Sequence, residues 1–100
     1  MDKTIWKAVL SPYPPIQQVS MPASAEIISA HEQGGQVAIW FKCDAPKAMS
    51  PLAMVTPEAE LRQPYIALVP TGGIVPEDGK FIGTVLMHGG SFVLHVFEFP

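Results

Sequence analysis

Seven side chains of this sequence have the chemical types that bind small molecules, and they fall on two largely apolar stretches. They are three imidazoles, an indole, an amine and two hydroxyls: Ser29, His31, Trp40, Lys42, Thr84, His88 and His95. An indole beside a cation and hydroxyl groups suits a base or nucleotide, because the base stacks on the ring. Tryptophan is also enriched at subunit interfaces and in cores, and we weigh that role of Trp40 ahead of ligand stacking. The seven residues form our candidate ligand-binding set.

The same side chains give little support to catalysis or metal binding. Zinc sites need nitrogen and sulfur ligands at short spacings, and no Cys, Asp or Glu shares the expected face of His88 and His95. Ser91 near His88 resembles half of a catalytic triad, but no acid is placed to orient the base. Cys43 is expected to face the core as a small hydrophobe. We therefore expect a protein without enzymatic activity, metal or cofactor.

The C-terminal twenty residues predict a β-hairpin that positions three of the candidates. Two apolar runs, 81–88 and 91–99, flank Gly89-Gly90, and a glycine pair favours the primed turns of tight hairpins. A two-residue loop gives one mixed face, whose pairs are His88–Ser91, Leu86–Val93, Thr84–His95 and Ile82–Phe97. The opposite face is apolar and is interrupted by Glu98 alone: Phe81, Gly83, Val85, Met87, Phe92, Leu94 and Val96.

A second Gly-Gly hairpin is predicted from 25–33 and 36–43, which flank Gly34-Gly35. Its mixed face carries the other four candidates, in the pairs Gln33–Gln36, His31–Ala38, Ser29–Trp40 and Ile27–Lys42. Its core face consists of Glu32–Val37, Ala30–Ile39 and Ile28–Phe41. Each hairpin thus combines one apolar face with one face of histidine, hydroxyl and aromatic groups.

The rest of the chain predicts short strands separated by prolines, of which there are eleven. Strands are expected at 4–10, 16–21 and 65–69, and reverse turns at 70–73 and 76–79. Residues 44–57 are expected to form a loop with a short irregular strand near 52–55, and 57–62 one helical turn. We therefore expect one all-β domain over residues 1–100. Its fold would be a small antiparallel sandwich or rolled sheet of about seven short strands, with little or no helix.

The composition predicts a homo-oligomer. Hydrophobic residues make up 48% of the chain and charged residues only 15%, so the apolar content exceeds what one small core hides. The alternative is a monomer with a tolerable apolar surface. The net charge of −3 and the scattered lysines and arginines argue against duplex nucleic acid as a partner. No apolar stretch is long enough for a membrane helix and no signal peptide is evident, so we expect a cytoplasmic protein.

Several short motifs resemble a group of small, uncharacterised bacteriophage and prophage proteins that is catalogued as a domain of unknown function. The motifs are Ile5-Trp6-Lys7, Met21-Pro22, Ala25-x-Ile27-Ile28-Ser29, Gln33 with Gly35, Trp40, Thr71-Gly72-x-Ile74, Ile82-Gly83-Thr84-Val85, Gly89-Gly90 and Val93-x-His95-Val96-Phe97-Glu98. The sequence departs from the group at Gly73, where many members have a histidine. The resemblance implies a phage origin and a location in the host cytoplasm, and it brings no established activity.

These observations lead to a hypothesis of a non-enzymatic phage protein that binds a host-derived partner as a homo-oligomer. In the first version it sequesters a nucleotide-like defence signal in pockets lined by the candidate set. In the second it inhibits a host protein by direct contact through an aromatic patch or a sheet edge. A third version, a structural accessory of the virion, requires only the oligomer.

Overall fold

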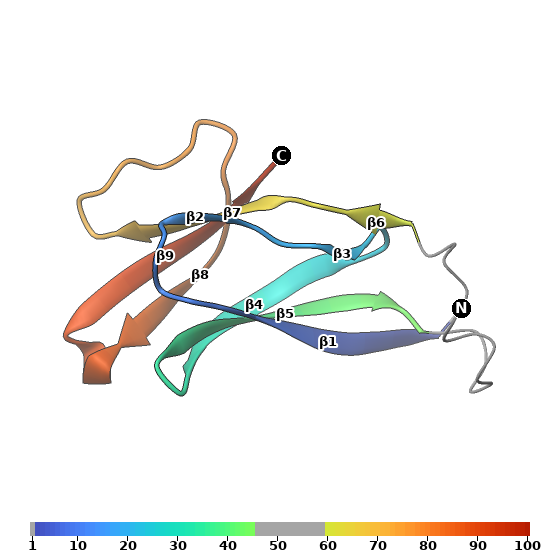
Figure 1. The fold of residues 1–100 in the computed structure, drawn as a ribbon, viewed down its shortest axis with the longest axis horizontal. Coiled ribbons are helices and arrows are strands. Elements are labelled where there is room, and N and C mark those ends of the chain that lie inside the picture. Colours follow the sequence, from blue (N-terminus) through green and yellow to red (C-terminus); the bar gives the residue numbers. More distant parts are fainter. Residues whose placement is uncertain (1, 46–59) are drawn as a thin grey trace.

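The computed structural model describes residues 2–45 and 60–100, and these form an all-β fold (Figure 1). This confirms the predicted fold class. The strands are β1 Lys3–Leu10, β2 Ile16–Gln18, β3 Met21–Pro22, β4 Glu26–Gln33, β5 Gln36–Asp44, β6 Leu61–Arg62, β7 Tyr65–Pro70, β8 Lys80–Met87 and β9 Phe92–Phe99. A single short 3₁₀ turn at His88–Gly90 is the helical element of the described part.

The strands form two main antiparallel sheets and a small ribbon. The three-stranded sheet has the order β1-β5-β4, and the four-stranded sheet has the order β2-β7-β9-β8. Strands β3 and β6 pair as a separate two-stranded ribbon near one end of the sheets (Figure 1). The two hairpins predicted from the glycine pairs therefore contribute to different sheets.

Outside the two hairpins, the strands differ from the prediction. The predicted strand 16–21 is divided into β2 and β3, which belong to different sheets, and Pro22 lies within β3. The predicted helical turn at 57–62 is wrong at its end, because Leu61–Arg62 form β6 opposite Met21 and Pro22. Residues 57–59 and the strand expected near 52–55 lie outside the described residues. The described residues form nine strands instead of about seven, because the short strands β3 and β6, of two residues each, were not expected as separate strands.

The first hairpin, β4–β5, keeps the predicted register from its turn as far as Ser29 opposite Trp40. Both turn glycines have positive φ (59° and 82°), the conformation that a two-residue primed turn requires. A bulge at Ile28 then shifts the pairing by one residue, so the observed pairs are Ile27–Phe41 and Glu26–Lys42. The predicted pairs Ile27–Lys42 and Ile28–Phe41 are wrong. The bulge buries Ile27 and leaves Ile28 exposed.

The second hairpin, β8–β9, also keeps its register but has a longer turn than predicted. The last ladder pair is Met87–Phe92, so His88 and Ser91 belong to the turn. The longer turn removes one residue from each strand and leaves the predicted pairs from Met87–Phe92 to Gly83–Val96 unchanged, so Thr84 faces His95 as predicted. A bulge at Ile82 replaces the predicted pair Ile82–Phe97 with Phe81–Phe97. Phe81 therefore lies on the outer face instead of the predicted core face.

The core lies between the two main sheets, and residues of both form one buried cluster. Its fully buried members include Val37 and Ile39 of β5, Ile66 of β7 and Val96 of β9. The alternation of inward and outward residues places the candidate positions of both hairpins on the outside. Strands β4 and β8 approach each other at one side of the core, where a Cβ added to Gly83 would lie 3.8 Å from the Ala30 nitrogen.

Candidate functional site

The outer face of the three-stranded sheet brings together four of the seven candidate residues. Ser29, Trp40 and Lys7 occupy one row across β4, β5 and β1. The Lys7 ammonium lies 5.4 Å from the centre of the Trp40 ring and 2.6 Å from the Gln33 Oε1 atom. His31 lies opposite Ala38 on the same face. The tryptophan ring is thus covered by a cation of its own chain.

Lys42, the fourth of these residues, is engaged in an exposed ion pair. Its Nζ lies 3.6 Å from Glu26 Oε1, with about half of each side chain in solvent. Such pairs contribute little free energy, because both charges stay hydrated. Lys42 therefore remains free to change partner, and this face presents two cations beside an indole.

The outer face of the β8–β9 hairpin carries a polar pair between two apolar pairs. In the centre, the Thr84 hydroxyl lies 3.1 Å from His95 Nδ1, and the Thr71 hydroxyl lies 3.0 Å from His95 Nε2. A hydroxyl both donates and accepts, so both imidazole nitrogens have a partner in either tautomer. The register places the pairs Phe81–Phe97 and Leu86–Val93 on either side of this centre. We call these three pairs of residues the hairpin face: Phe81, Thr84, Leu86, Val93, His95 and Phe97.

The structure does not bring all seven candidates together. Four lie on the outer face of the three-stranded sheet, whereas Thr84 and His95 lie on the outer face of the four-stranded sheet. No hydrogen bond or ion pair among the described residues connects the two groups. His88 belongs to neither group: it is exposed in the hairpin turn, with its ring centroid 6.4 Å from that of Phe92. A ligand pocket that combines Trp40 with His95 is not formed within one chain.

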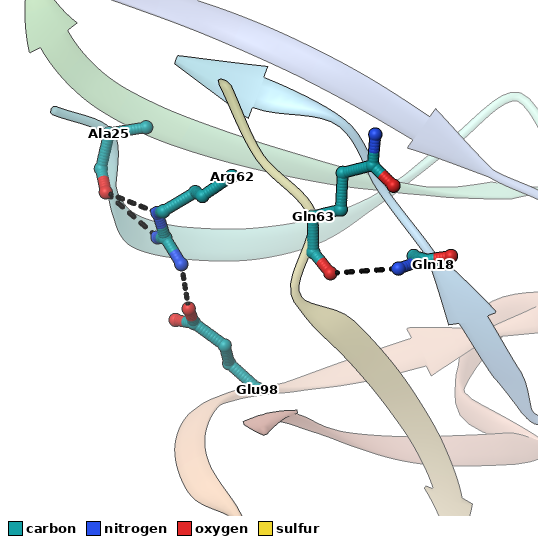
Figure 2. A network of polar contacts seen from close by, with 5 residues as sticks. All are labelled: Gln18, Ala25, Arg62, Gln63 and Glu98. Atoms are coloured by element: carbon teal, nitrogen blue, oxygen red, sulfur yellow. Dashed lines mark hydrogen bonds and ion pairs between the residues drawn. The ribbon is translucent and has the colours of Figure 1, made fainter. Parts of the chain in front are cut away.

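An open cleft of about 380 Å³ lies at the end of the core and was not predicted from the sequence. Arg62 of β6 forms one wall, and its guanidinium donates from Nε and Nη2 to the Ala25 carbonyl at 3.1 and 2.8 Å (Figure 2). The remaining Nη1 group donates to the Glu98 carboxylate. The other charged residues that line the cleft are Glu26, Asp78 and Lys80. The sequence signal was Glu98, the acid that interrupts an otherwise apolar strand face.

The Arg62 contacts make this corner of the molecule structural. One side chain connects the start of β4, the two-residue strand β6 and the end of β9 (Figure 2). Because three of its five N–H donors already bond to Ala25 and Glu98, Arg62 has few left for an anionic ligand. The cleft lining also holds three carboxylates against two cations, which disfavours phosphate groups.

Nucleophilic and metal chemistry finds little basis in the described residues. Cys43 points into the core, as expected, and burial together with the neighbouring Asp44 carboxylate raises the pKa of its thiol, which opposes thiolate formation at neutral pH. Within residues 2–45 and 60–100, no group of three His, Cys, Asp or Glu side chains is arranged to hold a metal ion.

The whole sequence matches one protein family. A family described as a domain of unknown function (DUF7352) matches residues 1–100, which is the whole sequence. The chain is a member of the DUF7352 family. Neither the curated proteins nor the solved structures include a match.

The DUF7352 chain therefore presents two outer faces that differ in chemistry. The face of the three-stranded sheet carries Trp40 with Lys7 and the exposed ion pair of Lys42 with Glu26, whereas the hairpin face is apolar around a histidine whose two nitrogens are hydrogen-bonded. Across the described parts of the chain, no helix has the length and apolar content needed to span a membrane.

Proposed function

We propose that this DUF7352 protein is a non-enzymatic binding protein that contacts another protein through the hairpin face. One observation carries the proposal: Phe81 and Leu86 are 56% and 59% exposed, and they flank a histidine whose two nitrogens are both engaged. Large apolar side chains that project from a rigid sheet are typical anchors of protein interfaces.

The polar centre of the face also supports this role. A partner that covers His95 removes it from water without leaving a ring nitrogen unpaired, since Thr84 and Thr71 already serve both nitrogens. Covering the hairpin face therefore lacks the usual penalty for burying an imidazole. The resemblance to phage proteins supports a host protein, in particular one that acts in defence, as the partner.

The test is affinity capture from host lysate with three forms of the protein. We expect wild type to retain a specific protein that Leu86→Arg loses, because a charge in the centre of an apolar contact must be desolvated. Tyr13→Arg is the matched control, since Tyr13 is also exposed but lies between β1 and β2. Equal retention by wild type and Leu86→Arg would contradict the proposal, provided that both variants unfold at the wild-type temperature.

A nucleotide-like ligand on the outer face of the three-stranded sheet is the second candidate. Trp40 with Lys7 and Lys42 supports it, because a base stacks on an indole while ammonium groups face phosphates. It ranks second because Lys7 must leave the ring before a base can stack. Calorimetric titration with cyclic dinucleotides tests it: heat that disappears in Trp40→Ala supports sequestration, and the absence of heat from wild type contradicts it.

A further inference from the structure

Strand β1 is the outer strand of its sheet, and no strand within residues 2–45 and 60–100 pairs with its second edge, which we call the free edge. It pairs along all eight residues with β5 and with no other described strand, and it borders the three-stranded sheet in Figure 1. The strand contains no proline, and its register with β5 has no bulge. Natural proteins interrupt or cover long regular edges, because these pair with other strands.

The lysines that commonly guard such an edge are turned away from it. Lys3 reaches across its own sheet to Asp44, and Lys7 lies over Trp40 and donates to Gln33. These partners, Asp44, Trp40 and Gln33, belong to β5 and β4, on the side of β1 away from the free edge. Beside this edge, Ile5 on one face of the sheet and Trp6 on the other are 56% and 54% exposed.

The hydrogen-bonding pattern shows which backbone groups face outward. The Ala45 amide donates to the Asp2 carbonyl at 2.9 Å, so this pair is hydrogen-bonded. Paired and unpaired positions alternate along an antiparallel ladder. Even-numbered residues of β1 therefore bond to β5, and the odd-numbered residues direct their N–H and C=O groups to the free edge: Lys3, Ile5, Lys7 and Val9.

We propose that β1 pairs antiparallel with β1 of a second copy of this chain. A two-fold axis perpendicular to the sheet keeps the outer faces of both copies on the same side. Even-numbered residues must therefore oppose even-numbered residues, and odd-numbered residues must oppose odd-numbered ones. The two registers with the longest overlap centre on Trp6 or on Lys7. Centring on Lys7 opposes two ammonium groups, which is destabilising.

The register centred on Trp6 avoids this repulsion and uses the outward groups fully. Ile5 then faces Lys7 of the second copy, and Lys3 faces Val9 of the second copy. These are pairs of odd-numbered residues, so each exchanges two hydrogen bonds. Trp6 lies beside Trp6 of the second copy at a non-hydrogen-bonded position, where side chains come closest. The result joins two three-stranded sheets into one continuous sheet.

This inference does not rest on the proposed function, because the hairpin face and β1 belong to different sheets. The dimer leaves both hairpin faces free. If the proposed function holds, the dimer presents two of them and binds a multivalent partner more tightly.

The test compares two substitutions at one position by analytical ultracentrifugation. Ile5→Lys places an ammonium opposite Lys7 of the second copy in both symmetric pairs, and we expect the dimer dissociation constant to rise about tenfold. Ile5→Glu places a carboxylate there, and we expect a constant several times lower than that of Ile5→Lys. Leu86→Lys, the control on the hairpin face, should leave the dimer unchanged. Wild type that stays monomeric at high micromolar concentration, or equal constants for Ile5→Lys and Ile5→Glu, overturns the proposal.

A disulfide reports the register independently. Opposed non-hydrogen-bonded residues have Cα atoms about 4.5 Å apart, which is within the range that a disulfide spans. Trp6→Cys should therefore form a covalent dimer under mild oxidation, whereas Val9→Cys should not, since Val9 opposes Lys3. Buried Cys43 does not compete. Efficient crosslinking through Val9→Cys, or none through Trp6→Cys, excludes this register.

Discussion

Glu98 projects from β9 toward the end of the core, where a carboxylate needs a partner. Its ladder neighbour Ile66 is fully buried, and most of the Glu98 side chain is removed from solvent. Arg62 supplies the opposite charge, and the Ala25 carbonyl accepts two further hydrogen bonds from its guanidinium, one from Nε and one from Nη2. The three groups satisfy one another, so removing one leaves the others unpaired.

We expect Arg62→Met to destabilise the protein by about 2 kcal/mol, because it leaves a largely buried carboxylate and a carbonyl without partners. Urea unfolding measures this change. Lys42→Met is the matched control, and loss of its exposed pair with Glu26 should cost less than about 0.5 kcal/mol. In the double variant Arg62→Met/Glu98→Gln the cost should fall below the sum of the single changes, and strict additivity would contradict the coupling.

The buried thiol of Cys43 leads us to expect that the free energy of unfolding falls at alkaline pH. Its thiol pKa is raised in the folded state, so the unfolded state releases its proton first as pH increases. The unfolded state then binds fewer protons, and the free energy of unfolding falls above the ordinary thiol pKa of about 8.5. This loss of stability grows between neutral pH and about pH 9.5. Urea unfolding of wild type and Cys43→Ala at both pH values should show a shallower decline in the variant, whereas parallel declines would refute it.

At the scale of elements, the bulges decide which residues of the hairpins enter the core. Each hairpin loses its predicted register beyond one isoleucine, Ile28 in β4 and Ile82 in β8. The bulges lie in the two strands that approach each other where Gly83 meets Ala30. Bulges increase local twist, which helps two sheet edges to close around one core.

Gly83 and Gly73 differ in the space that is available for an added methyl group. A Cβ at Gly83 would meet Ala30 at normal van der Waals distance (3.8 Å), so Gly83→Ala should stabilise the fold by about 0.5 kcal/mol through the unfolded state. A Cβ at Gly73 would lie 3.0 Å from the Pro70 oxygen and from Val69 Cγ1, so Gly73→Ala should cost about 1 kcal/mol or more. Thermal unfolding compares them, and the opposite order would show that β4 and β8 are packed more tightly than described.

At the scale of the molecule, one core connects the two main sheets. Ile39 of β5 is fully buried in a cluster that includes Val96 of β9. Ile39→Ala should cost about 3 kcal/mol, and hydrogen exchange of the protected amides in both sheets should accelerate together, because they unfold as one unit. Ile16→Ala, the same change at an exposed position, should cost less than about 1 kcal/mol. Acceleration confined to the three-stranded sheet would show two independent units and contradict the predicted single domain.

The sequence by itself determined the fold class and the pairing of each hairpin between its turn and its bulge. Gly34-Gly35 and Gly89-Gly90 marked the turns, and alternation of apolar residues then placed Ser29 opposite Trp40 and Thr84 opposite His95. These features are local, since a turn and a period of two residues fix which neighbours meet. Even the longer second turn kept the register, because it shortened both strands equally.

Only the tertiary structure decided which sheet each hairpin joined, where the bulges fell and what Glu98 contacted. The sequence showed Glu98 as an anomaly, but its partner Arg62 lies thirty-six residues away in a strand that exists only by pairing with β3. It likewise assigned Trp40 and His95 to the ligand pockets of an oligomer, and the tertiary structure showed that one chain carries them on the outer faces of different sheets. Such outcomes depend on how two sheets pack around a shared core, and that packing is set by contacts between distant segments that no local pattern encodes.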